Sequence, residues 1–249
     1  MSIEQEVLLL GVGGGMLASF CIGIVVWALF DTARAYVFFR RSVVLVQRSM
    51  PFERLISDAS QKILVLGDST AVGTGCENSE LSTAGRLAIL YPQASVRNLA
   101  VNGLRLEGLR KMLDAFETKE HFALILVQIG ANDIIRFTDM DRIKNDAAYV
   151  FERLSKQTDK LVILHSGDVG KATFFPFYIR PFLSDRSERM RQMYLLLAKT
   201  CNAKYVDLMD SPSDKLLSST PRLYYAADKL HLNGAGYGLW FSEIKKLLG

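Results

Sequence analysis

The sequence contains few cysteine and histidine residues, which limits the chemistry available to it. Only three of its 249 residues are cysteine, and only three are histidine. Cys21, Cys76 and Cys201 include no close pair and lack the spacing of zinc ligands, so we expect free thiols and no bound metal. Lysine and arginine form no stripe interleaved with aromatic residues, and we therefore expect no nucleic-acid partner.

Known glycine-containing motifs are missing from the stretch GDSTAVGTG at residues 67–75. A P-loop requires a lysine near its end, and a dinucleotide-binding loop requires G-x-G-x-x-G. The nucleophile elbow of an α/β-hydrolase requires G-x-S-x-G, whereas Ser69 lies in GDSTA. None of these motifs fits, so we expect no cofactor and look for another role of Ser69.

Charged residues are missing from residues 7–30, VLLLGVGGGMLASFCIGIVVWALF. As a helix this run would be about 36 Å long, enough to cross the hydrocarbon core of a membrane. A cleaved signal peptide is the main alternative, because ARA at residues 33–35 is similar to a cleavage site. The acidic start MSIEQE lacks the Lys or Arg of a signal peptide, however, so we expect one uncleaved transmembrane helix.

Basic residues follow this apolar run, and none precedes it. Four arginines lie soon after it: Arg34, Arg40, Arg41 and Arg48. The positive-inside rule then predicts a single-pass membrane protein with residues 31–249 in the cytoplasm. Export of the domain is the alternative, because some proteins with one span break this rule.

Residues 36–50 place apolar side chains at spacings of three and four, which indicates a helix that ends before Pro51. This helix either lies amphipathically at the membrane interface or packs on the rest of the protein. The chain is therefore divided into three predicted parts: a tail and membrane helix (1–30), a juxtamembrane linker (31–60) and a catalytic domain (61–249).

Strand-like and helix-like segments alternate from residue 61 onward. The predicted strands cover residues 62–67, 95–100, 122–130, 160–166 and 203–208. The predicted helices cover residues 82–91, 104–117, 140–157, 186–200 and 235–248. Two of the strands contain ILVL and ALILV, and such unbroken apolar runs are typical of strands buried on both faces. This pattern predicts a three-layer α/β/α sandwich with a mostly parallel five-stranded sheet.

The turns GDST, VNG and GAND follow the first three predicted strands. Ligands of such sheets bind beyond the carboxyl ends of the strands, so we expect these turns to meet at one rim. A nucleophilic serine there needs a base and a group that orients the base. His121 precedes a strand and His165 has no adjacent acid in sequence, whereas His231 follows Asp228 by three residues. That spacing lets the carboxylate accept the Nδ1 proton while Nε2 faces Ser69.

Four short blocks together resemble those of the SGNH, or GDSL-type, hydrolase superfamily. They are GDST at residues 67–70, Gly103 in LAVNG, Asn132 in GAND and DKLH at residues 228–231. The resemblance extends over about residues 61–249. Two positions depart from the family pattern, Thr70 in place of leucine and Leu232 in place of a frequent proline, and neither has a catalytic role.

The resemblance implies a flavodoxin-like fold and a serine esterase, lipase or thioesterase. It implies that Ser69 is the nucleophile, that His231 is the general base and then the acid, and that Asp228 orients the imidazole. The implied oxyanion hole consists of the Ser69 and Gly103 backbone N–H groups and the Asn132 side-chain amide.

The anchor favours an acyl ester or thioester of a lipid, such as a lysophospholipid, as the substrate of a Ser69 acyl-enzyme. Removal or transfer of O-acetyl groups on a carbohydrate is an alternative that uses the same residues. A catalytically silent domain that binds lipid or a partner at the membrane is a third hypothesis. The presence of Ser69, Asp228 and His231 argues against it, because a binding domain does not need all three.

Residues 167–183, GDVGKATFFPFYIRPFL, form a long connection after the fourth predicted strand. They leave the strand at the rim where Ser69 is expected. We expect Phe174, Phe175 and Phe177 to bind the acyl chain as a cover or groove wall. Packing over the protein's own helices is the alternative.

Overall fold

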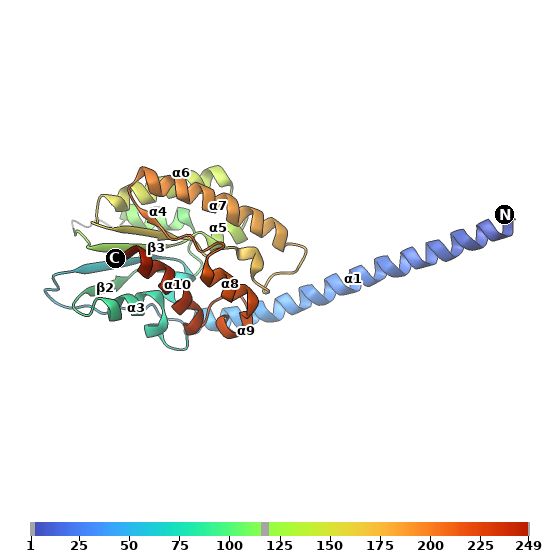
Figure 1. Cartoon of the computed structure of the whole chain (residues 1–249), viewed down its shortest axis with the longest axis horizontal. Helices are drawn as coiled ribbons and strands as arrows, with labels where there is room; N and C mark the ends of the chain where they lie inside the picture. The colour runs from blue at the N-terminus through green and yellow to red at the C-terminus, as the bar shows by residue number, and fades with distance from the viewer. Residues whose placement is uncertain (1–2, 116–119, 249) are drawn as a thin grey trace.

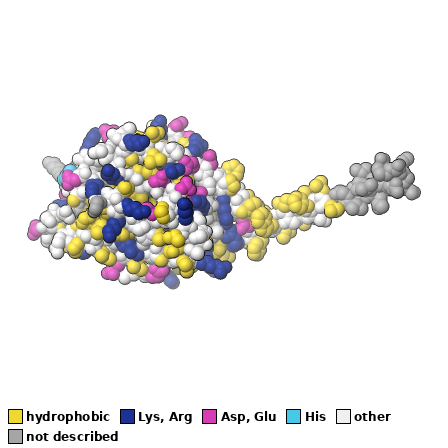
Figure 2. Space-filling model, in the orientation of Figure 1, with side chains coloured by type: hydrophobic (Ala, Val, Ile, Leu, Met, Phe, Trp, Pro, Cys, Tyr) yellow, Lys and Arg dark blue, Asp and Glu magenta, His cyan; other side chains and the backbone are white. Residues whose placement is uncertain are grey.

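A computed structural model describes residues 3–115 and 120–248, with side chains from residue 16 onward. Its first element, α1 (Ile3–Arg48), is one continuous helix that extends far beyond the rest of the protein (Figure 1). The predicted membrane helix and the predicted helix of residues 36–50 are therefore one element. Among the described residues, one helix, Met16–Arg48, is long and apolar enough to cross a membrane, a property that signal sequences share. Apolar side chains are frequent along the part of this protruding helix that Figure 2 colours by residue type.

The central sheet contains five parallel strands in the order β2-β1-β3-β4-β5. They are β1 (Lys62–Gly67), β2 (Ser95–Asn98), β3 (Leu124–Gln128), β4 (Leu161–Leu164) and β5 (Lys204–Tyr205). The parallel pairing of every neighbouring pair confirms the predicted mostly parallel sheet. The predicted strands are too long at several ends because pairing stops early; β5 pairs with β4 only through Lys204 and Tyr205.

Five of the described helices match the helices predicted between and after the strands, and they pack on the two faces of the sheet. They are α3 (Thr83–Leu90), α4 (Leu106–Ala115), α6 (Met140–Ser155), α7 (Arg180–Thr200) and α10 (Gly234–Leu248). Buried side chains of α4, α6 and α7 share one apolar cluster, and those of α3 and α10 share the other. The two groups of helices lie on opposite sides of the sheet (Figure 1), which confirms the three-layer α/β/α sandwich.

Several short elements were not expected from the sequence. They are α2 (Ser69–Val72), η1 (Ser79–Leu81), α5 (Ala131–Ile135), η2 (Val169–Lys171), α8 (Pro212–Ser219) and α9 (Pro221–Tyr224). The predicted start of a helix at residue 186 is also wrong, because α7 begins at Arg180. Pro181 lies in its first turn, where the missing N–H of proline costs no hydrogen bond. The aromatic connection is therefore shorter than predicted.

Candidate active site

Ser69 is positioned by a tight turn at the end of β1. Gly67 has φ of 145°, and a Cβ there would lie 1.9 Å from the Gln128 carbonyl oxygen, so only glycine fits. Asp68 then caps α2, with its carboxylate accepting hydrogen bonds from the Thr70 N–H at 2.9 Å and the Thr70 hydroxyl at 2.8 Å. Ser69 is thus the first residue of a helix at the carboxyl edge of the sheet.

His231 connects Ser69 to Asp228. Its Nε2 lies 2.9 Å from Ser69 Oγ, and its Nδ1 lies 2.6 Å from Asp228 Oδ2. The other carboxylate oxygen of Asp228 accepts the backbone N–H groups of Leu230 and His231, each at 3.1 Å. The short turn between the acid and the histidine therefore fixes both side chains, as their spacing predicted.

The protonation of Asp228 is controlled by two opposing effects. Its complete burial raises the pKa of the carboxyl group, but hydrogen bonding and charge from His231 together with two backbone N–H groups bring the pKa below its ordinary value. Asp228 is therefore ionised at neutral pH. An ionised carboxylate next to Nδ1 stabilises an imidazolium that forms when Nε2 accepts a proton.

Gly103 and Asn132 lie with Ser69 and His231 around one cavity. Gly103 has φ of 76°, a conformation that L side chains seldom adopt, and it follows the end of β2. Asn132 lies on α5, which follows β3. Within the described part of the chain, the Asn132 side chain has no hydrogen-bond partner, so its amide is available to an oxygen atom bound in the cavity.

The cavity has a volume of about 320 Å³, within the range of sites for small molecules. Most of its wall is apolar and includes Phe39 of α1, Phe174 and Trp240. Among the described residues, Arg136 is the one lysine or arginine that lines it, and Asp168 is the one carboxylate there. The arrangement suits a largely apolar molecule with a reactive polar group.

The three predicted aromatic residues are not all placed in this cavity. Phe174 lines it. Phe175 is buried in the apolar cluster that includes α4, α6 and α7, and Phe177 stacks on Trp27 of α1, with 3.7 Å between ring centroids. The sequence interpretation missed Phe39, Ser42 and Arg136 as lining residues. The helical spacing of apolar residues in 36–50 included Phe39, but no local pattern indicated Ser42 or Arg136.

The sequence matches the GDSL-like Lipase/Acylhydrolase family over residues 65–239. The chain belongs to this family. It is 25% identical over 203 residues to the GDSL-like esterase Rv1075c of Mycobacterium tuberculosis, a match that covers 78% of this chain and 61% of that esterase. The chain therefore spans less than two thirds of the length of that relative.

Solved structures share the fold of this GDSL-family chain. One is a member of the lipolytic protein G-D-S-L family from Veillonella parvula, with a TM-score of 0.60, 15% identity and coverage of 76% of this chain and 98% of that one. Another is Axe2, an acetylxylan esterase from Geobacillus stearothermophilus, with a TM-score of 0.55, 16% identity and coverage of 77% of this chain and 95% of that one.

Two further acids, Asp68 and Asp133, are the sequence neighbours of Ser69 and Asn132. Burial raises the pKa of Asp68 to about 6, against the hydrogen bonds from Thr70 and the charge of His231. Burial also raises the pKa of Asp133, whose carboxylate accepts the Leu106 N–H at 3.0 Å. Both side chains accept hydrogen bonds from backbone N–H groups and therefore stabilise the local backbone.

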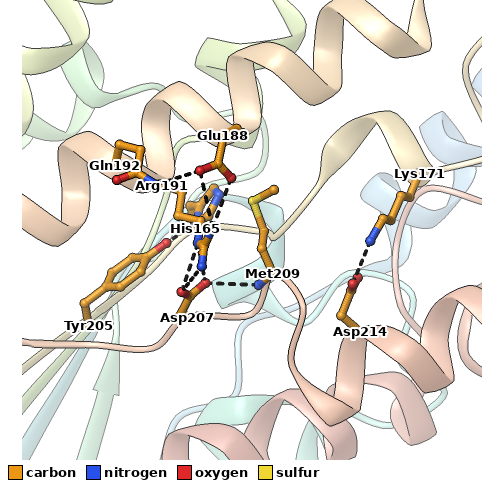
Figure 3. Close-up of polar contacts among 9 residues, drawn as sticks. All are labelled: His165, Lys171, Glu188, Arg191, Gln192, Tyr205, Asp207, Met209 and Asp214. Carbon is orange, nitrogen blue, oxygen red and sulfur yellow. Dashed lines mark hydrogen bonds and ion pairs between the residues drawn. The ribbon is translucent and has the colours of Figure 1, made fainter.

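The other two histidines of the GDSL-family chain lie outside the cavity lining. His121 is exposed and contacts Asp159 at 2.8 Å. His165 is fully buried, and its Nδ1 lies 2.8 Å from the Tyr205 hydroxyl (Figure 3). Arg191 lies beside this pair and bonds the carboxylates of Asp207 and Glu188 (Figure 3). These contacts join α7 to the ends of β4 and β5.

The burial of His165 predicts an acid-sensitive fold. Burial lowers the pKa of His165 to about 4, from an ordinary value of 6.5. The unfolded chain takes up this proton below about pH 6.5 while the folded chain does not, so the free energy of unfolding falls as pH decreases from about 6.5 to about 4. The loss should approach 3 kcal/mol, at about 1.4 kcal/mol per pKa unit.

Denaturant unfolding of the wild-type protein and His165→Asn across this pH range measures the effect. The variant should lose less unfolding free energy than wild type, because asparagine does not titrate. Comparison of the two proteins removes contributions that they share, including that of Asp68. Parallel pH profiles would contradict the prediction.

Proposed function

We propose that the protein hydrolyses acyl esters through a covalent acyl-enzyme on Ser69. The observation that carries this proposal is the continuous chain from Asp228 to His231 to Ser69, with distances of 2.6 and 2.9 Å. In this reaction Ser69 Oγ attacks the ester carbonyl carbon and transfers its proton to His231 Nε2. A serine, a base and a buried acid in this order form the general arrangement for acyl transfer.

The same residues complete the cycle. The imidazolium of His231 gives its proton to the leaving alkoxide as the carbon–oxygen bond breaks, which leaves an acyl group on Ser69. A water molecule then loses a proton to His231 Nε2 and attacks the acyl carbon. The proton returns to Ser69 Oγ as the carboxylic acid departs, so that the enzyme is regenerated.

The negative charge on the carbonyl oxygen is stabilised by fixed donors. We assign this role to the backbone N–H groups of Ser69 and Gly103 and to the Asn132 side-chain amide, which border the same cavity. Such donors require no reorganisation at the moment of reaction and are therefore effective in a water-poor site. Gly103 brings no side chain that would separate its N–H from the oxygen.

We infer an amphiphilic substrate, a lysophospholipid or a similar lipid ester or thioester. Its acyl chain would occupy the apolar part of the cavity, against Phe174. The position of Arg136 supports an anionic group near the ester. Its guanidinium lies close to Gly103, since a Cβ built on Gly103 would be 3.7 Å from Arg136 Nη2. The Arg136 guanidinium has no hydrogen-bond or ion-pair partner within the described residues, so it is available to a phosphate or carboxylate.

Arg136→Met is expected to raise KM for a lysophospholipid about tenfold or more, because a hydrogen bond to a charged group contributes roughly 1.5–3 kcal/mol. The KM for a neutral p-nitrophenyl ester should change much less. Arg142→Met, at an exposed position of α6, is the matched control and should leave both values as in wild type. Equal increases of KM for both substrates in Arg136→Met would contradict the assigned role.

We also propose that α1 anchors the enzyme in a membrane with residues 31–249 in the cytoplasm. The exposed apolar side chains between Met16 and Phe30 support the anchor, and Arg34, Arg40 and Arg41 support the orientation. A reporter fused to the carboxyl terminus tests this assignment. A reporter that is active only after export from the cytoplasm should be inactive in this fusion. If it is active, the extracytoplasmic alternative is favoured.

A carbohydrate O-acetyl esterase is the second candidate, because Axe2, which has a similar fold, is an acetylxylan esterase. Hydrolysis of p-nitrophenyl esters of graded chain length by the full-length protein distinguishes the two. We expect kcat/KM to rise with chain length, whereas a strong preference for acetyl would favour the carbohydrate substrate. No hydrolysis of any ester would favour the silent binding domain.

A further inference from the structure

We propose that α1 is also part of the substrate site: it forms one wall of the cavity and holds the aromatic segment of residues 173–177, so that the cavity receives the acyl chain of a lipid from the same membrane. This inference rests on the proposed function and names the source of its substrate. The anchor is thereby a specificity-determining element as well as a membrane attachment.

The wall is formed by two residues of α1 that lie on one face of the helix. Phe39 and Ser42 are three positions apart, and both line the cavity that contains Ser69 and His231. Ser42 is buried, whereas the Phe39 side chain remains 52% exposed. A side chain that lines a cavity and is also half exposed lies at its mouth, so the cavity opens beside α1.

Asp31 and Arg34 connect α1 to the backbone of residues 173–177. Asp31 Oδ2 accepts the Phe177 N–H at 2.7 Å, and its Oδ1 accepts Arg34 Nε at 2.8 Å. Arg34 Nη1 donates to the Thr173 carbonyl oxygen at 2.5 Å. Both ends of the segment are therefore bound to the helix by charged groups, whose hydrogen bonds are stronger than those between neutral groups.

A second arginine supports the same segment from α7. Arg180 Nε donates to the Phe175 carbonyl oxygen at 3.0 Å, and Arg34 Nη2 approaches that oxygen at 3.4 Å. Phe174 lies between these tied residues and projects into the cavity lining. The position of Phe174 therefore depends on contacts made by α1. These contacts join distant parts of the sequence, since Arg34 and Thr173 are 139 residues apart.

Aromatic contacts place this connection close to the apolar part of α1. Trp27 stacks on Phe177, and the Thr32 hydroxyl lies 2.8 Å from that of Tyr178. Tyr178 is 45% exposed and Phe182 is 62% exposed. Exposed tryptophan and tyrosine at the end of an apolar helix are typical of the membrane–water interface.

The position of the cavity along α1 indicates that the substrate reaches it from the bilayer. Phe39 follows Phe30, the end of the uncharged run, by nine residues, or about 13 Å of helix. The headgroup layer itself is about 5–7 Å thick on each side of the hydrocarbon core. The cavity mouth thus lies just beyond the headgroups, within reach of an acyl chain that is still partly in the bilayer.

The test uses the full-length protein in phosphatidylcholine vesicles, with p-nitrophenyl acetate as a soluble ester and p-nitrophenyl palmitate as an embedded one. Asp31→Ala and Arg34→Met should raise KM for the palmitate about tenfold, with a much smaller change in kcat. The acetate should be affected far less. Arg34→Lys should recover part of the loss, because it restores one donor.

Arg40→Met is the matched control, since Arg40 lies on the same helix and its one hydrogen-bond partner among the described residues is Tyr36, one turn away. This variant should behave as wild type with both esters. Equal losses of acetate and palmitate hydrolysis in Asp31→Ala, with a lowered melting temperature, would overturn the proposal. Unchanged KM for palmitate in both Asp31→Ala and Arg34→Met would also overturn it.

Binding separates this proposal from the proposed function. Ser69→Ala protein should bind an ether-linked lysophosphatidylcholine, which cannot be hydrolysed, about tenfold more tightly than the Ser69→Ala/Asp31→Ala protein. If wild type hydrolyses no ester but this difference is found, the acyl site stands and the proposed reaction fails. Equal binding by the two proteins would overturn the acyl site while leaving ester hydrolysis unaffected.

Discussion

Replacing Ser69 with alanine is expected to abolish ester hydrolysis, with a fall in kcat on the order of 10⁵-fold or more. Alanine has no oxygen to attack the carbonyl carbon, so no acyl-enzyme forms and His231 has no proton to accept. The cavity remains intact because the change removes a single atom from a small side chain. Hydrolysis of p-nitrophenyl esters by the full-length variant measures the effect.

Ser60→Ala is the control for this experiment. Ser60 is exposed just before β1 and lies outside the cavity lining, so its replacement should leave the rate as in wild type. Ser69→Ala should retain the melting temperature of wild type. A Ser69→Ala protein that hydrolyses esters at more than a few per cent of the wild-type rate would contradict the assignment of the nucleophile.

Asn132→Ala should have the second largest effect, a fall in kcat of about 100- to 1,000-fold, or roughly 3–4 kcal/mol. The amide is expected to interact with the carbonyl oxygen most strongly when that oxygen becomes negative, so KM should change little. Asn132→Asp should be at least as damaging, because a carboxylate next to the developing charge repels it.

Asn145→Ala on the exposed side of α6 provides the comparison and should be fully active. The division of the effect between kcat and KM is decisive here. A variant Asn132→Ala with normal kcat and a raised KM would assign the amide to binding of the ground state instead of stabilisation of the oxyanion.

The central strands could be predicted because their sequence is unusual. Residues 63–66 and 124–127 are apolar at every position and fully buried, so they had to lie inside a sheet covered on both faces. β5 was harder to predict, because its two residues are held by pairing with β4 and by the contacts of Tyr205 with His165. Its limits depend on neighbours that no local pattern reveals.

The residues of the proposed catalytic triad could be predicted for a different reason. Asp228 and His231 are three residues apart and occupy one turn. Their spacing permitted a bonded pair, and the resemblance of the four sequence blocks singled it out. Ser69 lies 162 residues from His231. Their contact followed from the expectation that the ends of parallel strands meet at one rim, together with the resemblance of the four sequence blocks.

The contribution of α1 to the cavity could not be inferred in this way. The bond between Asp31 and Phe177 joins residues 146 positions apart, and neither residue belongs to a recognisable motif. The sequence placed a domain boundary at residue 61 and left open whether residues 36–50 lie at the membrane interface or pack on the rest of the protein. Phe39 and Ser42 lie before that boundary, yet they line the same cavity as Ser69.

Mass spectrometry of the full-length protein after reaction with a fluorophosphonate tests the central claim most directly. The phosphorus atom should be attacked by Ser69 Oγ with loss of fluoride, so we predict one adduct, located on the peptide that contains Ser69. His231→Ala should react far more slowly, because the serine then lacks its base. An active preparation that gains no adduct, or gains it on another residue while Ser69 remains unmodified, would contradict the claim.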